Sequence, residues 1–316
     1  MGIWIEARDG SWSQELTGCC TSVDVLSKRN DGASVLTAEL FYDQKELQPG
    51  CRVMWEQDGT QIFKGTLFSA QKSSSGMAQL RAYDQLRYMK TRDTMMAGGQ
   101  TIGALLRQIC RSFELELGTV EDSGYVLWQE IAVGRTLLDI LYQKIAETEN
   151  MTGEAYVLQD EWGALCLRRE RSLYLPLCIA DATICTSYTV TQDIEETYNR
   201  IVLGTQGSTY GMRRVSEQSD AESIEKYGVL QYYQRVAQTD SSAEIERLGR
   251  TLLKQNKNMK QRFFLQAMGD FSVRAGCVIQ VDLEGLGKRQ CRVLEAEQWI
   301  KQGIHQMRLE VEELAE

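Results

Sequence analysis

The chain has 316 residues, a formal net charge of −9 and a single histidine. Its acidic balance argues against sequence-independent binding of nucleic acid, which requires a cationic surface. A single histidine excludes a metal site built on several histidines. Apolar residues make up 43% of the chain and charged residues 25%, a balance typical of globular proteins, and the length suffices for two or three domains.

No targeting or membrane segment is expected. The sequence contains no run of about 18 apolar residues, so nothing in it is expected to span a membrane. The first residues, "MGIWIEARDG", lack the basic and apolar regions of a secretory signal. The nine cysteines form no CxxC pair and mostly lie in apolar patterns, which predicts reduced, buried thiols in a protein made in the cytoplasm.

Residues 1–95 are predicted to form a first β domain. Apolar and polar residues alternate through "SVDVLSK", "SVLTAELFYD", "CRVMWEQDGTQIFKGTLFSAQK" and "MAQLRAYDQ", the period of half-buried strands. Turn signals such as "NDGAS" and "SSSG" separate these runs. The phrase "WEQDGTQIF" predicts a hairpin with Asp58 and Gly59 at its turn.

The period changes within residues 96–176, where a small α/β domain is predicted. Thr101 and Thr136 each precede apolar residues at helical spacing, and both fit the N-cap position. The two stretches begin alike, with "GQTIGALLRQIC" and "GRTLLDILYQKIA", and this phrase faintly resembles the start of LysM peptidoglycan-binding modules. A glycine, a threonine cap and an amphipathic helix produce the same phrase unaided, so we interpret it as two helix starts. "EAYVLQDEWGALCLRRE" then predicts a hairpin.

Residues 177–316 are predicted to form a second β domain, with "ATICTSYTVTQ" and "YNRIVLGTQ" among its strands. A polar insertion is expected at about 207–240 and a helix at about 242–257. Ser241 and Glu244 fit a capping box at the start of that helix. The final stretch, from "GCVIQV" to "RLEVEE", again alternates as strands do.

The end of the chain resembles its beginning. "GCRVMW" at Gly50 matches "GCVIQV" at Gly276, an offset of 226 (276 minus 50), and the strand alternation is kept downstream. After a gain of one residue, "GMAQLR" aligns with "GIHQMR". Upstream, "CTSVDV" at Cys20 resembles "CTSYTV" at Cys185. Two explanations stay open, a duplicated β domain and the generic sequence pattern of β-hairpins.

No catalytic, cofactor-binding or metal-binding residue is predicted. His305 lies in "GIHQMRLEV", which alternates as a strand, so we interpret it as a strand residue rather than a catalytic base. Asp160 and Glu161 are interpreted as the tip of a hairpin rather than as a glycosidase pair. "GLGKRQ" at Gly285 lacks the spacing of a phosphate-binding loop. Basic runs such as "GMRRVS" and "LRRERS" are interpreted as solvated faces.

Several tyrosines crowd the insertion "TYGMRRVSEQSDAESIEKYGVLQYYQRV", namely Tyr210, Tyr227, Tyr232 and Tyr233. Tyrosine is enriched at protein contacts, so these residues fit a partner surface. They fit equally well a strand and loop that pack on their own domain. Both interpretations stay open, and the residues that bind a partner remain unknown at this stage.

A family resemblance is carried by "AYDQLRYMKTRDT" (Ala82 to Thr94) followed by "QTIGALLRQIC". Together they resemble the XkdQ/YqbQ family of phage tail proteins, and "YNRIVL" and "EKYGVLQYYQRV" resemble further family segments in the same order. That family is similar to baseplate hub proteins of contractile tails, tailocins and related injection machines. Such hubs carry two tube-like β-barrel domains and form trimers, whose six barrels match the six-fold tail tube above and the three-fold spike below.

The expected fold is therefore α+β and mainly β, with two tandem tube-like antiparallel β-barrel domains separated by a small α/β domain. The resemblance implies a non-enzymatic structural hub in the tail baseplate of a virion or phage-like particle, assembled in the bacterial cytoplasm. Its implied partners are further copies of the chain in a homotrimer, the tail tube protein, the spike, and other baseplate and tape-measure components. No cofactor, membrane or specific nucleic-acid partner is expected. The alternative is a cell-wall-binding or peptidoglycan-degrading tail-tip protein.

Overall fold

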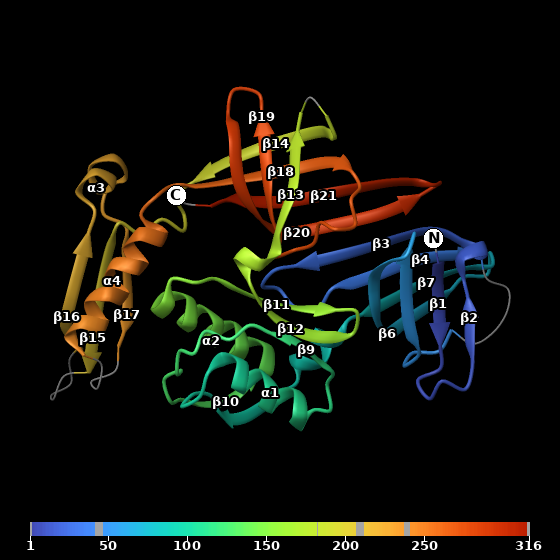
Figure 1. Cartoon of the computed structure of the whole chain (residues 1–316), viewed down its shortest axis with the longest axis horizontal. Coiled ribbons are helices and arrows are strands. Elements are labelled where there is room, and N and C mark those ends of the chain that lie inside the picture. Colours follow the sequence, from blue (N-terminus) through green and yellow to red (C-terminus); the bar gives the residue numbers. More distant parts are fainter. Residues whose placement is uncertain (1, 42–46, 182, 207–211, 237–240, 315–316) are drawn as a thin grey trace.

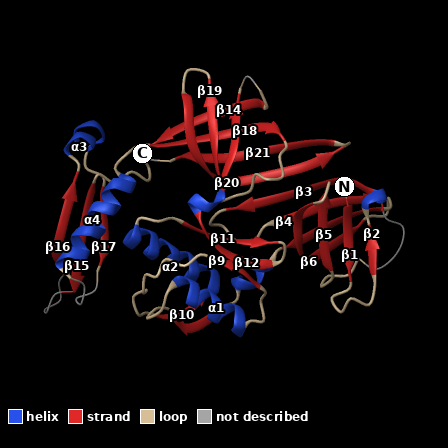
Figure 2. Ribbon diagram, viewed as in Figure 1, coloured by secondary structure: helices blue, strands red, loops and turns tan. Residues whose placement is uncertain are grey.

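The computed structural model describes residues 2–41, 47–181, 183–206, 212–236 and 241–314. Strands predominate, and the α-helices gather in two places (Figures 1 and 2). The predicted α+β, mainly β class is thereby confirmed. Four apolar clusters form separate cores, one in each of two β units, one in a middle unit and one in a small outlying unit.

The first β unit is an antiparallel sheet with the strand order β3-β4-β7-β6-β5-β1-β2. Its elements are β1 (Gly2–Glu6), β2 (Ser13–Glu15), the 3-10 helix η1 (Thr17–Cys19), β3 (Cys20–Lys28), β4 (Val35–Phe41), β5 (Arg52–Gln57), β6 (Thr60–Lys72) and β7 (Met77–Tyr83). The alternation seen in the sequence places every second residue inside; in β7, Ala78, Leu80 and Ala82 are buried. Trp55, fully buried, is the largest side chain of this core.

The second β unit has the strand order β14-β18-β21-β20-β19-β13. Its strands are β13 (Tyr174–Ala180), β14 (Cys185–Asp193), β18 (Lys260–Met268), β19 (Val278–Leu283), β20 (Gly287–Lys301) and β21 (Ile304–Glu313). All neighbours pair antiparallel except β13 and β19, which run parallel. Phe263, Leu265 and Ile279 lie in its core.

The two β units repeat one another strand by strand. The order β3-β4-β7-β6-β5 corresponds to β14-β18-β21-β20-β19, and Gly50 and Gly276 precede the equivalent strands β5 and β19. The amide of Gly50 donates to the carbonyl of Leu67, and the amide of Gly276 donates to the carbonyl of Val293, at the same offset of 226. Of the two explanations left open by the sequence, a duplicated β unit is the one that the topology supports.

The irregularities of strand pairing also repeat between the two β units, and they correct the sequence alignment of the units. A register shift follows Cys20 in β3 and Cys185 in β14, and the thiol of each donates to the carbonyl oxygen two residues later. Leu80 and Leu309 both face their cores from the equivalent strands β7 and β21. Their offset is 229 (309 minus 80), which exceeds the offset of 226 between Gly50 and Gly276 by three. The second β unit therefore gains three residues after Gly276, and the gain of one residue predicted from the sequence is wrong. The extra residues lengthen the β20–β21 hairpin.

The expectation of closed barrels is wrong, because among the described strands neither β unit pairs its first strand with its last to close on itself. Instead β3 pairs antiparallel with β20, from Ser22 opposite Lys301 to Lys28 opposite Glu295, and the units merge into one 13-stranded sheet. The edge of β3 that a closed barrel would have used is therefore occupied by the other unit. Figure 1 shows β3 and β20 side by side where the two units meet.

The middle unit lies against both β units (Figure 1). Its elements are η2 (Gln85–Lys90), β8 (Arg92–Met96), α1 (Ile102–Ser112), β9 (Leu117–Val120), β10 (Ile131–Thr136), α2 (Leu137–Thr152), β11 (Tyr156–Glu161), β12 (Ala164–Arg169) and η3 (Glu170–Leu173). The side chains of Thr101 and Thr136 accept hydrogen bonds from the amides of Ala104 and Asp139, at 3.2 and 3.1 Å. The repeated phrase is thus confirmed as two helix starts.

The outlying unit corrects the expected insertion. Its elements are β15 (Arg200–Gln206), β16 (Met212–Ser219), α3 (Ala221–Tyr227), β17 (Gln231–Arg235) and α4 (Ser242–Asn256). The segment assigned from sequence to the second β domain, β15, belongs to a separate three-stranded sheet with β16 and β17, because Ile201 and Leu203 pack in one cluster with Leu248 of α4. The capping box of Ser241 and Glu244 is confirmed.

Candidate functional site

His305 lies in β21, as predicted. Its ring stacks on Phe271 with centroids 3.7 Å apart, and its Nε2 lies 2.8 Å from Oε1 of Gln298. Burial lowers the pKa of His305. The amide nitrogen of Gln298 donates in turn to the carbonyls of Asp270 and Val273, so the histidine completes a packed hydrogen-bonded corner of the second β unit.

Asp160 and Glu161 end strand β11 and lead into the β11–β12 turn, as predicted. Glu161 faces Arg168 across the hairpin, with 3.7 Å between the charged groups. Asp160 behaves differently, because only 3% of it is exposed. No local sequence pattern indicates that this carboxyl group turns inward.

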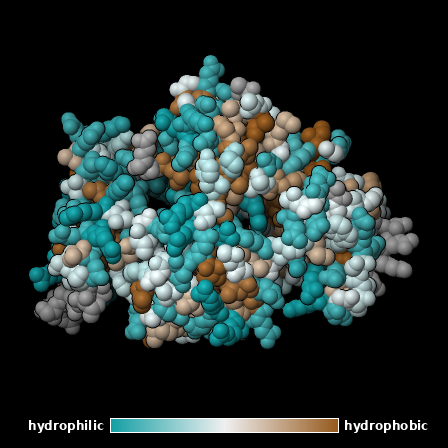
Figure 3. Space-filling model, viewed as in Figure 1, coloured by the Kyte–Doolittle hydropathy of each residue, from teal (hydrophilic) through white to brown (hydrophobic). Residues whose placement is uncertain are grey.

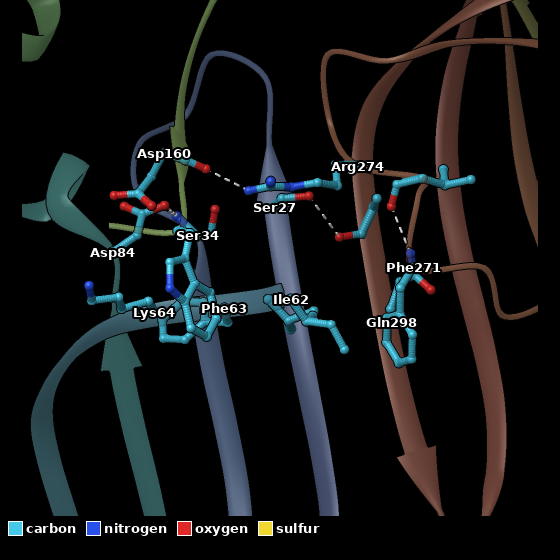
Figure 4. A pocket seen from close by; sticks show the side chains of 14 residues that line it. Ser27, Ser34, Ile62, Phe63, Lys64, Asp84, Asp160, Phe271, Arg274 and Gln298 are labelled. Atoms are coloured by element: carbon cyan, nitrogen blue, oxygen red, sulfur yellow. Dashed lines mark hydrogen bonds between the residues drawn. The ribbon is translucent and has the colours of Figure 1, made fainter. Parts of the chain in front are cut away.

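The carboxyl groups of Asp160 and Asp84 meet at the junction of the three large units (Figure 4). Oδ2 and Oδ1 of Asp84 accept from the amides of Ser34 and Leu86, at 2.8 and 2.9 Å. Oδ1 and Oδ2 of Asp160 accept from the amides of Gly163 and Gln85, at 2.6 and 3.2 Å. The two carboxyl groups thus hold the β3–β4 loop, the start of η2 and the β11–β12 turn together.

Burial and mutual repulsion perturb this pair. Desolvation, and next to it the charge of Asp160, raises the pKa of Asp84 to about 7. Desolvation raises the pKa of Asp160 to about 6, opposed by its backbone hydrogen bonds. Two close carboxyl groups in a low-dielectric site cannot both ionise cheaply. We therefore expect the pair to hold a proton near neutral pH.

A cavity of about 30 Å³ adjoins the pair, enough for one or two water molecules. The guanidinium of Arg274, from the second β unit, reaches across it and donates to the carbonyl of Asp160 at 2.6 Å. Because all four carboxyl oxygens already accept backbone amides, the arrangement resembles a structural joint more than a general acid and base. The sequence contains one indication of a structural role for Asp84. This aspartate ends "AYD" and directly precedes η2, where it caps the short helix.

A second buried cluster joins the same three units. Glu170 in η3 pairs with Arg29 beyond β3 at 2.9 Å and with Arg292 in β20 at 3.0 Å. Glu170 and Arg29 are buried, at 8% and 6% exposure. Burial lowers the pKa of Arg29, opposed by the charge of Glu170. The cluster fixes the middle unit against both β units at the β3–β20 seam, and its long-range pairing is not visible in the sequence.

The tyrosines of the insertion do not form one surface. Tyr232 packs on Tyr198 with ring centroids 5.3 Å apart, whereas Tyr233, its neighbour in β17, points to the opposite face and is 44% exposed. Tyr210 lies outside the described residues. Tyr232 therefore packs within the outlying unit, whereas for the exposed Tyr233 both interpretations stay open.

The edges of the 13-stranded sheet are the remaining candidate for function. Strand β14 pairs with β18 on one side, and no other described strand pairs with it. Most of its residues are exposed. Apolar side chains are also exposed on the second β unit, among them Phe264, Met268 and Ile304, and Figure 3 shows brown patches over this unit.

Other kinds of site are not evident in the described part of the chain. No group of three or more histidine, cysteine, aspartate or glutamate side chains there has the geometry of a metal site. All nine cysteines are free thiols, five of them buried or nearly so and the rest half-buried. None of the described helices is long and apolar enough to cross a membrane.

Curated relatives match most of the chain. The protein YqbQ of Bacillus subtilis (strain 168) is 24% identical over 291 residues, which cover 90% of this chain and 88% of that protein. The phage-like element PBSX protein XkdQ of the same bacterium is 24% identical over 289 residues, with the same coverage.

Solved structures share the fold. The tail protein of Neisseria meningitidis matches with a TM-score of 0.72 and 12% identity, over 99% of this chain and 97% of its own. The 43 kDa tail protein of prophage MuSo2 from Shewanella oneidensis matches with a TM-score of 0.71 and 11% identity, over 98% of both chains. The c3393 protein of E. coli, a component of the type VI secretion system, matches with a TM-score of 0.57 and 7% identity, over 94% of this chain and 74% of its own. The family model described as YqbQ-like matches residues 23–312, so this chain belongs to the YqbQ-like family.

Proposed function

We propose that the chain is a structural baseplate hub of a contractile phage tail or a phage-like injection particle. The observation that carries the proposal is the repeated β unit, joined strand to strand within one chain by β3 and β20. Membership of the YqbQ-like family and similarity to XkdQ, a protein of a phage-like element, support this proposal. The shared fold with tail proteins and with a secretion-system component supports the same role.

The repeated unit gives the proposed mechanism, which is symmetry adaptation. Two β units in each chain become six in a homotrimer, because a cyclic assembly multiplies each unit by the number of subunits. A ring of six similar units fits a six-fold tail tube on one face, while three whole chains fit a three-fold spike on the other. The tail tube protein, the spike and other baseplate components are the proposed partners, and the assembled virion or particle is the proposed location.

The proposed domains are residues 1–95, 96–176 and 177–316, with the outlying unit inserted in the last. Separate apolar clusters support this division. We assign no enzymatic role to any of them. The buried Asp84–Asp160 pair is the nearest approach to an acid–base arrangement in the described residues, and its oxygens are occupied by backbone amides.

Imaging of particles purified from the producing bacterium tests the proposal. We expect three copies of the chain in a ring between tube and spike. Any other number of copies at the tail tip, or a position elsewhere in the particle, would refute it. The purified chain should also release no soluble fragments from peptidoglycan under conditions in which a muramidase does; turnover that a single carboxylate substitution abolishes would favour the wall-degrading alternative.

A further inference from the structure

Two arginines stack on aromatic rings on the outer face of the first β unit, the face turned away from its core. Arg81 ends outward from β7, and Arg87 lies in η2, within "AYDQLRYMKTRDT". The guanidinium carbon of Arg87 lies 5.3 Å from the ring centre of Phe68 and 5.8 Å from that of Tyr83. That of Arg81 lies 5.6 Å from the ring centre of Tyr83. These distances are those of cation–π contacts.

The rings hold one another in place. Phe68 packs edge-on against Tyr83, with ring centroids 5.3 Å apart, and at a tilt against Tyr88, with centroids 5.8 Å apart. The hydroxyl of Tyr88 donates to Thr66 at 3.1 Å. Phe68 lies in a β-bulge of β6 and is 36% exposed. The two arginines and three rings, Phe68, Arg81, Tyr83, Arg87 and Tyr88, therefore form a fixed surface that water reaches, here called the arginine–aromatic cluster.

The positive charges of this cluster are not neutralised within the described part of the chain. There, the side chains of Arg81 and Arg87 form neither an ion pair nor a hydrogen bond. Arg81 is exposed and Arg87 is half-buried. Both guanidinium groups lie near the same ring and repel one another, and an anion bound to both would remove that repulsion.

The second β unit shows that the repeated fold does not require unpaired charges on this face. At the offset of 229 that relates β7 to β21 (310 minus 81), Arg81 and Tyr83 correspond to Glu310 and Glu312. Both carboxylates lie close to the guanidinium of Arg262, at 4.0 and 3.5 Å. The equivalent charges are thus paired inside the chain in one β unit and left without a partner of opposite charge in the other.

A single carboxylate fits this surface better than a polyanion. A guanidinium stacked on a ring keeps its planar edge free, and that edge matches the two oxygens of a carboxylate. Asp24 lies opposite Thr37, and Thr37 lies opposite Arg81, so Asp24 shares the outer face with the cluster. Glu39, two residues beyond Thr37 in β4, shares it as well. These carboxylates and the net charge of −9 disfavour nucleic acid, whereas one acidic side chain avoids most of that repulsion.

We propose that the arginine–aromatic cluster is the docking site for another protein of the particle, which places an aspartate or glutamate side chain against Arg81 and Arg87 and an apolar side chain against Phe68. Arginine and tyrosine are the residues that most often dominate the binding energy of protein contacts. The inference rests on the proposed function, because it places the partner in the same particle. It adds the surface that the partner contacts and the chemistry by which the partner is recognised.

Carbodiimide cross-linking of assembled particles tests the contact. The reagent joins a lysine amine to a carboxylate that lies against it and leaves arginine unchanged. In particles that carry Arg87→Lys, we expect a covalent link from position 87 to an aspartate or glutamate of a different protein, identified by mass spectrometry. Wild-type particles give the background. Arg111→Lys is the matched control, because Arg111 is an exposed arginine at the end of α1 that also forms no ion pair in the described residues.

Charge reversal measures how much the contact contributes. Arg87→Glu sets a carboxylate against the carboxylate of the partner and should lower the amount of chain incorporated into particles at least about tenfold. Arg87→Lys and Arg111→Glu should leave incorporation unchanged. The melting temperature of the purified chain reports folding, and Arg81→Glu, at an exposed strand position, replaces Arg87→Glu if that variant melts lower than the wild type.

Three results would overturn the docking site. They are a yield of links from Arg87→Lys no higher than from Arg111→Lys, a link to this chain or to a second copy of it, and normal incorporation of a folded charge-reversed variant. A three-copy ring with any of these results would leave the hub role intact. A link to an acidic residue of a different protein, in particles that carry another number of copies, would support the docking site and refute the trimeric hub.

Discussion

The duplicated glycines Gly50 and Gly276 offer a matched test of how the middle unit packs on the second β unit. Both have φ well into the positive range, +98° and +93°, and both donate the equivalent hydrogen bond. Their surroundings differ. A Cβ at Gly50 meets nothing within 4 Å, whereas a Cβ at Gly276 lies 2.5 Å from Cγ1 of Val157 in β11.

Alanine at either position imposes backbone strain of about 1–3 kcal/mol. At Gly276 it also forces a methyl group against Val157, which is 2% exposed and has little room to move. Such overpacking costs about 1–3 kcal/mol. We therefore expect Gly276→Ala to lower the free energy of unfolding by about 1–3 kcal/mol more than Gly50→Ala does.

Urea unfolding followed by tryptophan fluorescence measures this difference, from the shift in midpoint at unchanged slope. The double variant Gly276→Ala with Val157→Ala should be more stable than the sum of the single effects predicts, since the smaller side chain relieves the clash. Equal losses for Gly50→Ala and Gly276→Ala, or strict additivity with Val157→Ala, would refute the packing of β11 on the second β unit.

Two further predictions concern the buried charges. Glu170→Gln leaves Arg29 and Arg292 without their carboxylate and should lower the free energy of unfolding by about 3 kcal/mol. The control Glu295→Gln, in the half-exposed pair with Lys28, should lower it by less than about 1 kcal/mol. Equal losses for the two variants would contradict the role of the buried cluster. The pKa of Asp84, raised from 3.8 to about 7, means that the folded state binds a proton which the unfolded state releases. The stabilising contribution of that proton is complete below pH 4 and is lost as the pH rises to 7. The stability difference between the wild type and Asp84→Asn, measured by urea unfolding, should therefore shrink by a few kcal/mol from pH 4 to pH 8, at about 1.4 kcal/mol per pKa unit. A difference that stays constant over this range would show that Asp84 is ionised throughout.

Local chemistry allowed much of this protein to be predicted from its sequence. Alternating residues predicted the strands, because a pleated backbone sends successive side chains to opposite faces. Thr101, Thr136 and Ser241 predicted helix starts, because a hydroxyl satisfies amides that the first turn leaves free. Gly50 and Gly276 revealed the repeat, because each must adopt a backbone conformation that other residues avoid.

Only the tertiary structure decided how these parts meet. The amino-acid sequence of β3 does not reveal whether its outer edge pairs with β20 or closes a barrel. Both arrangements use backbone hydrogen bonds, which do not depend on side-chain identity. The sequence predicted Asp160 at the tip of a hairpin. In the structure it also belongs to a buried carboxyl pair, because Asp84, 76 residues earlier in the chain (160 minus 84), lies beside it. The exposed edge of β14 likewise follows from its place at the end of the sheet, which the strand order alone reveals. Contacts between distant segments depend on how whole sheets pack, and local sequence patterns do not encode that arrangement.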